Sequence, residues 1–106
     1  MNNFSDMLSK AKAMQEKMRE AQDQIKKIEV EGDAGGNLVK VILTGDYEIK
    51  SIEITEAAKK ENQEIINDLI IAAYNSAKEN LKKRSAEELS KVTGGLNLPS
   101  DFKLPF

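Results

Sequence analysis

The chain has 106 residues, a net charge of −2 at pH 7, and neither cysteine nor histidine. This length accommodates one domain with a modest core, and the two missing residue types exclude disulfides, thiolate metal sites and the usual zinc or haem ligands. They also remove the side chains that most often activate a nucleophile, so we expect no enzyme, no metal or other cofactor and no small-molecule substrate. No apolar run approaches the roughly 20 residues of a membrane span, and a signal-peptide core is absent, so we expect a cytoplasmic protein without a membrane partner.

The charges are unevenly distributed along the chain. Residues 10–27 carry six basic and three acidic side chains, a net charge of +3, whereas residues 28–77 carry four basic and ten acidic ones, a net charge of −6. Residues 78–91 are basic again, with five basic and three acidic side chains and a net charge of +2. This basic, acidic, basic order says more about the partners of the protein than its total charge does.

Residues 1–28 predict a projecting N-terminal helix. Apolar side chains recur every three or four residues, in the pattern of a heptad seam. The seam residues are Phe4, Met7, Ala11, Met14, Met18, Ala21, Ile25 and Ile28. A helix over these four repeats is roughly 36 Å long at about 1.5 Å per residue, too long to lie wholly against the core of a small domain. The sequence leaves open whether the seam pairs with a second helix of the same subunit or with another chain.

Residues 29–54 predict a three-stranded antiparallel sheet with one face covered by helix. Alternating apolar and polar residues mark the strands, and clusters of glycine, aspartate and asparagine mark the turns. The strands are expected near residues 28–31, 38–44 and 47–54, with turns at residues 32–37 and 45–46. In the second strand, Val39, Val41 and Leu43 fall on one face, which we expect to be buried.

The third strand has a break in its alternation. Ile49 has one parity, whereas Ile52 and Ile54 have the other. A single extra residue in the strand restores all three to one face, which predicts a β-bulge near Lys50 and Ser51.

The Gly35-Gly36 pair invites comparison with a phosphate-binding loop. It lacks the lysine and serine of a P-loop and precedes a strand instead of opening a helix. A hairpin turn that needs positive φ accounts for the two glycines.

Residues 55–62 predict a polar loop with a short helical turn, and residues 63–92 predict a second long helix. The first half of this helix is apolar almost all round, so we expect one side to face the sheet and the other to meet a second subunit. The residues assigned to this dimer interface are Ile65, Ile66, Leu69, Ile70 and Ala73. After Tyr74 the apolar stripe narrows and basic residues crowd the helix, so we expect this half to leave the core. Glycines and prolines predict an extended tail over residues 93–106.

Basic residues of the two long helices form the candidate site for binding a polyanion. Lys12, Arg19 and Lys26 share one heptad position, with about 10 Å between charges along the helix axis. Such a row can neutralise phosphates without reading bases. Ion pairing with acids on the same helix is the ordinary alternative. The full candidate set is Lys10, Lys12, Lys17, Arg19, Lys26, Lys78, Lys82, Lys83 and Arg84.

Three segments of the sequence carry a family resemblance. Residues 29–41 contain E-V-E-G, A-G-G and L-V-K-V, and residues 68–77 read D-L-I-I-A-A-Y-N-S-A. Residues 93–106 contain T-G-G-L-N-L-P followed by F-K-L-P-F. In this order the segments resemble the YbaB/EbfC family of bacterial nucleoid-associated proteins, which typically shows D-L-I-x-A-A-[FY]-N-x-A in the second segment. The resemblance covers essentially the whole chain.

The resemblance implies an α+β subunit of α-β-β-β-α order and a homodimer with projecting helices. It implies binding of double-stranded DNA with limited sequence preference, in the nucleoid, with a role in nucleoid organisation or gene regulation. It also hints at a recombination or replication protein as a partner. The family has no sharply defined binding motif, so the candidate site rests on charge placement alone.

A protein-interaction module is the alternative hypothesis. In that case the chain would dock a DNA repair or replication protein, and contact with DNA would be incidental. The candidate docking residues are the apolar ones of the tail: Leu96, Leu98, Phe102, Leu104 and Phe106. Docking by leucine and phenylalanine depends little on salt, whereas binding to phosphates weakens steeply as salt rises.

Overall fold

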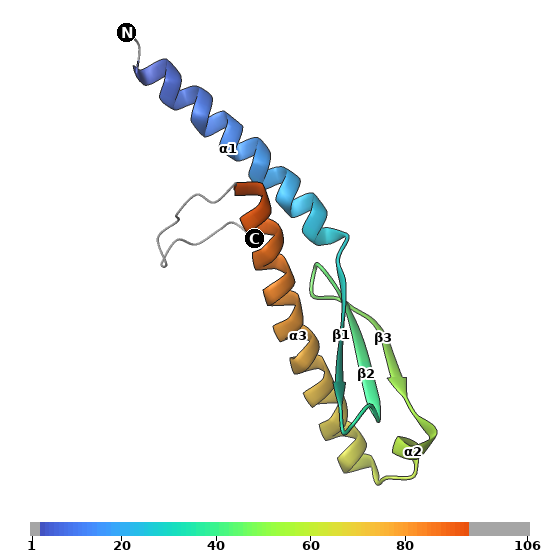
Figure 1. Ribbon diagram of the computed structural model, residues 1–106. Coiled ribbons are helices and arrows are strands. Elements are labelled where there is room, and N and C mark those ends of the chain that lie inside the picture. The colour runs from blue at the N-terminus through green and yellow to red at the C-terminus, as the bar shows by residue number, and fades with distance from the viewer. Residues whose placement is uncertain (1–2, 94–106) are drawn as a thin grey trace.

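The computed structural model describes residues 3–93, without the side chains of Val92 and Thr93. The elements follow the order expected from the sequence, with one further short helix in the loop where a helical turn is predicted (Figure 1). They are α1 (Asn3–Lys26), β1 (Glu29–Ala34), β2 (Val39–Thr44), β3 (Ile49–Ile54), α2 (Glu56–Lys59) and α3 (Gln63–Thr93). The tail beyond residue 93 lies outside the described residues.

The three strands form an antiparallel sheet of order β1-β2-β3, and α3 lies along one face of it (Figure 1). The alternation predicted for β2 is confirmed, because Val39, Val41 and Leu43 are fully buried. Ala73 and Leu81 of α3 are also fully buried in this core. The α+β fold therefore has two layers, a helix on a sheet, around a single core.

The predicted bulge is present in β3. Ile52 and Ile49 pair with Val41 and Leu43 respectively, and the register shifts between them so that Lys50 is the extra residue. A residue paired directly across an antiparallel ladder shares the face of its partner. Both isoleucines therefore lie on the side of the sheet that carries α3.

The first turn is shorter than the sequence predicts. Gly32 belongs to β1, which runs on to Ala34, and only the following residues turn the chain. The reason is tertiary: a Cβ on Gly32 would lie 2.1 Å from the backbone nitrogen of Ala77 in α3, so this glycine allows the helix to pack directly on the strand. Gly35 and Gly36 do adopt positive φ, of 67° and 66°, as a hairpin turn requires.

The C-terminal parts of α1 and α3 pack against each other (Figure 1). Ala21 and Ile25 of the seam are buried, and Leu81 of α3 is fully buried. The expectation that α3 leaves the core after Tyr74 is therefore wrong for at least the next two turns, because a narrow stripe suffices to pack against another helix. Gly45 fixes the junction, since a Cβ there would lie 1.7 Å from the carbonyl oxygen of Ile25.

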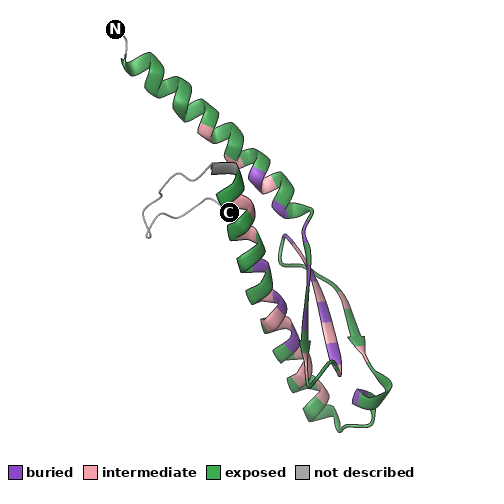
Figure 2. Cartoon of the chain, viewed as in Figure 1, coloured by how far each residue is buried: buried purple, intermediate pink, exposed green. Residues whose placement is uncertain are grey.

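The N-terminal half of α1 projects beyond α3. Residues 3–13 are all exposed, and the subunit measures 73 × 23 × 17 Å (Figure 2). We call residues 3–13 the arm. The seam thus pairs within the subunit at its C-terminal end and is uncovered on the arm.

We predict that Gly32→Ala lowers the free energy of unfolding by about 2–3 kcal/mol, because the added methyl group must push α3 off β1. Urea unfolding at a fixed protein concentration measures the change. Gly36→Asn is the matched control: nothing lies within 4 Å of its Cβ position, and asparagine tolerates positive φ. The control is expected to cost less than about 0.5 kcal/mol. Equal costs for the two variants would contradict the close-packing role of Gly32.

Candidate nucleic-acid interface

The candidate basic residues of α1 are on the surface, and most are free of ion pairs. Those without an ion pair to any residue in the range 3–91 are Lys10, Lys12, Lys17 and Lys26. Arg19 is different, because its Nη2 donates to Oε1 of Glu16, one turn earlier. The four lysines therefore keep their full charge available to a partner.

The charges of α1 are sorted around the helix. With Phe4 at heptad position a, positions e and g flank the seam. They hold Leu8, Gln15, Gln22, Lys10, Lys17 and Gln24. The acidic residues of the helix, at positions c and f, are Asp6, Glu16, Glu20 and Asp23. The seam side of α1 is thus apolar and cationic, with the acids turned away from it.

The basic residues of α3 do not form one patch. Lys82, Lys83 and Arg84 are consecutive, so their side chains leave the helix about 100° apart. Lys82 is also partly neutralised by Glu79, at 3.5 Å. Lys78, one turn before, is half-buried. A cluster that is dense in the sequence is therefore dispersed around the helix.

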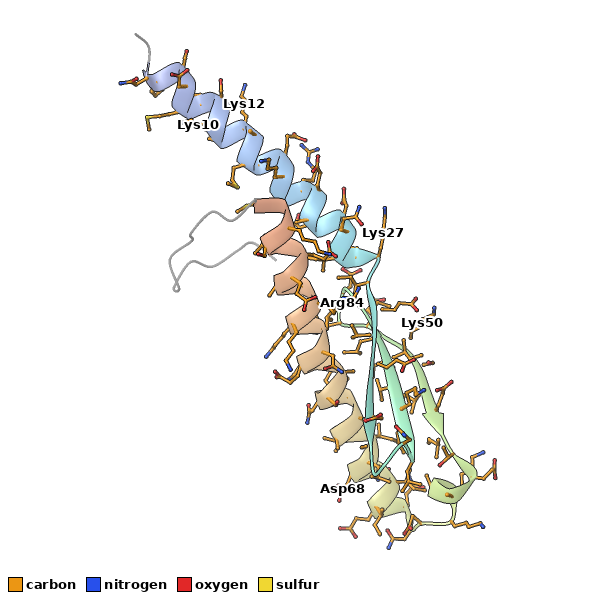
Figure 3. The ribbon with its side chains drawn as sticks, viewed as in Figure 1. Lys10, Lys12, Lys27, Lys50, Asp68 and Arg84 are labelled. Atoms are coloured by element: carbon orange, nitrogen blue, oxygen red, sulfur yellow. The ribbon has the colours of Figure 1, made fainter. Side chains whose placement is uncertain are left out.

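The structure does not gather the nine candidate residues into a single site. Lys10 and Lys12 lie on the projecting arm, whereas Arg84 lies beside the sheet at the middle of the subunit (Figure 3). The cations instead follow the long axis of the molecule on both helices. This arrangement suits contacts spread along an extended polyanion better than a compact pocket for one anionic group.

The open face of the sheet is acidic. Glu29, Glu31 and Asp33 of β1 alternate with residues that are buried under α3, and so they lie on the opposite, exposed face. Lys50 and Lys40 neutralise two of these acids, with Nζ–Oε2 distances of 2.6 Å to Glu29 and 3.7 Å to Glu31. The residual negative charge disfavours contact between this face and a phosphate backbone.

An apolar groove runs between α3 and β3. Tyr47, Ile49, Ile70, Ile71 and Tyr74 line it together with Glu48, and its volume is about 640 Å³. Ile71 is 59% exposed, although it is a large apolar residue in the middle of a helix. The groove exists because α3 packs on β1 and β2 and leaves β3 uncovered.

The residues predicted for a dimer interface divide between this surface and the core. Ile70 lines the groove, and Ile65 is 41% exposed. Ile66 is half-buried, Leu69 packs against the core, and Ala73 is fully buried within the subunit, so it offers no free surface.

Sequence reasoning missed the contribution of the β2–β3 turn to this surface. Tyr47 lines the groove and also a second cavity of about 480 Å³, which it shares with Ile25 of α1 and Leu89 of α3. Its φ is 63°, a conformation that bulky residues rarely adopt. A tyrosine in a turn that would suit glycine or asparagine is the signal that could have found it.

The described residues offer neither a metal-binding cluster nor a membrane-spanning helix. Among the described side chains, no group of three or more aspartate, glutamate, histidine or cysteine residues could hold a metal ion. No helix within the described residues is long and apolar enough to cross a membrane.

Comparison with known proteins gives the same family as the sequence motifs. The model of the YbaB/EbfC DNA-binding family matches residues 1–96. The chain is 43% identical to a nucleoid-associated protein of Bartonella bacilliformis, over 100% of this chain and 99% of that one. It is 44% identical to one of Rickettsia typhi, over the full length of both, and 36% identical to one of Hahella chejuensis, over 98% and 96%. The chain belongs to the YbaB/EbfC DNA-binding family.

Proposed function

We propose that this protein is a homodimer that binds double-stranded DNA and acts in the bacterial nucleoid. The basic residues of its two long helices contact the phosphates, and the binding has little sequence preference. The family is one of DNA-binding proteins, not of enzymes. The observation that carries the proposal is the set of lysines on α1 without an ion pair, namely Lys10, Lys12, Lys17 and Lys26. Two of them, Lys10 and Lys17, flank the seam on the side of the helix that carries no acid. Nucleoid organisation or gene regulation is the role that fits such binding.

The type of cation supports low sequence preference. Seven of the nine candidate residues are lysines, and one of the two arginines, Arg19, already contacts Glu16. Lysine presents a point charge on a flexible stem, whereas the planar arginine fork reads guanine by two hydrogen bonds at once. Contacts from such lysines are strong at phosphates and weak in discriminating bases.

The proposed second copy of the chain would cover the apolar groove between α3 and β3. Four large apolar side chains, each more than 40% exposed, lie on or beside the side of β3 that α3 leaves bare: Tyr47, Ile49, Ile52 and Ile71. Burying it against an identical surface would double the number of cationic helices on one particle. The acidic open face of the sheet would stay outside such an interface.

We predict that Lys10→Gln, Lys12→Gln and Lys17→Gln together weaken binding to a random-sequence duplex at least roughly tenfold near 0.1 M salt. The slope of log affinity against log salt concentration should fall by about 0.9 for each phosphate that the variant no longer neutralises. Lys82→Gln, Lys83→Gln and Arg84→Gln together should cost less, because their side chains diverge around α3. Fluorescence anisotropy over a salt series measures both quantities.

The matched control for these variants is Lys59→Gln with Lys60→Gln, which removes two exposed cations from the acidic middle of the chain. It should leave affinity and slope within twofold of the unchanged protein. All the substituted side chains are exposed, so unfolding free energies should change by less than about 0.5 kcal/mol. Binding whose affinity does not change with salt would refute phosphate contacts and favour the protein-docking alternative. Nothing in the described residues supports that alternative.

We predict that Ile71→Glu converts the dimer to a monomer, because it places a charge in an apolar contact while leaving the subunit core intact. Light scattering after size-exclusion chromatography measures the mass. Ala57→Glu, at an exposed position of α2, is the control and should remain dimeric. A dimer of Ile71→Glu as stable as that of the control would show that the groove is not the interface.

A further inference from the structure

The tip of the arm carries the two most exposed large apolar side chains in the described part of the chain. Phe4 is 69% exposed and Met7 66%, and Leu8 beside them is 49% exposed. Their spacing of three and four residues places them on one side of α1, and in Figure 2 no element of the described residues covers this end of the helix. The tip therefore presents a small exposed apolar surface at the end of a helix.

Pairing with the arm of a second copy fits this tip poorly. In a parallel helix pair, residues at position g face those at position e of the partner, so Lys10 and Lys17 would meet glutamines. In an antiparallel pair, position g faces position g, and lysine would meet lysine. Neither orientation offers the opposite charges that stabilise such a pair, whereas an anionic partner satisfies both lysines.

We propose that the tip of the arm is a wedge that inserts Phe4, with Met7 and Leu8 beside it, between stacked base pairs from the minor groove. Lys10 and Lys12 are on opposite sides of the seam, one to two turns behind the tip, so each can reach the phosphates of a different strand. Apolar side chains that enter a base step in this way unstack it and bend the duplex. This inference rests on the proposed DNA binding and adds a deformation of the DNA to it.

A lipid surface is the competing anionic partner. Helices that lie in a membrane interface usually expose an apolar face along most of their length. Here the exposed large apolar residues of α1 are confined to the first two turns, because further along the seam is covered progressively by α3. A short apolar tip followed by flanking cations matches a base step better than a bilayer.

The test uses short duplexes that contain 2-aminopurine, whose fluorescence rises when its neighbours unstack, and a donor and acceptor dye at the two ends. The full chain is compared with the variant Phe4→Ala, Met7→Ala, Leu8→Ala. We expect the unchanged protein to raise the fluorescence at least twofold and to shorten the end-to-end distance. The variant should do neither, yet keep the same salt slope and lose less than tenfold in affinity.

A conservative variant, Phe4→Leu with Met7→Leu, keeps apolar bulk at the tip and should retain both signals. Unstacking that survives in the alanine variant, or binding by the unchanged protein without unstacking or bending, would overturn the wedge and leave the proposed DNA binding in place. No binding of the duplex at low salt would overturn both. Loss of the dimer in the alanine variant would assign the tip to contact with a second copy and overturn the wedge. Loss of binding to phosphatidylserine vesicles in that variant, with its effect on DNA unchanged, would assign the tip to a membrane and also overturn the wedge.

Discussion

The backbone contact between β1 and α3 at Gly32 determines the shape of the subunit. A helix that packs this closely has its axis fixed over β1 and β2, since a Cβ on Gly32 would lie 2.1 Å from a backbone nitrogen of α3. A helix about 10 Å wide covers two strands that are about 4.8 Å apart, so the third strand of the sheet is left bare. The open groove beside Ile49 and Ile71 is a consequence of where α3 is held.

The same contact between β1 and α3 also determines which end of α1 is packed and which end is exposed. Because α3 lies over the far side of the sheet from the acids of β1, its C-terminal half meets α1 at Ala21 and Ile25. Gly45 then seats the last turn of α1 on the β2–β3 turn. One end of α1 is fixed against α3 and this turn, and the other end is covered by no described element. The helix therefore projects from the subunit, with Lys10 and Lys12 on its free end.

Local periodicity predicted most of the fold. The alternation of Val39, Val41 and Leu43 identified the buried face, and the parity break at Lys50 located the bulge. Gly32 was assigned to a turn because its neighbours have turn composition, and only the approach of a helix distant in the sequence makes it a strand residue. The candidate site was harder to predict, since the sequence does not say which lysines are paired or buried: Lys82 contacts Glu79, and Lys78 is half-buried.

A net charge of −2 is compatible with binding a polyanion because the excess of acids lies in residues 28–77, away from the arm. The acids of β1 occupy the open face of the sheet, beyond the opposite end of α1 from its arm (Figure 1). Residues 12–26 of α1 alone span about 21 Å at about 1.5 Å per residue. At physiological salt the Debye length is about 8 Å, so acids at this separation are screened and do not cancel the field around Lys10 and Lys12. The acidic face would repel a phosphate backbone, and this favours the two long helices as the side for the proposed contact with DNA.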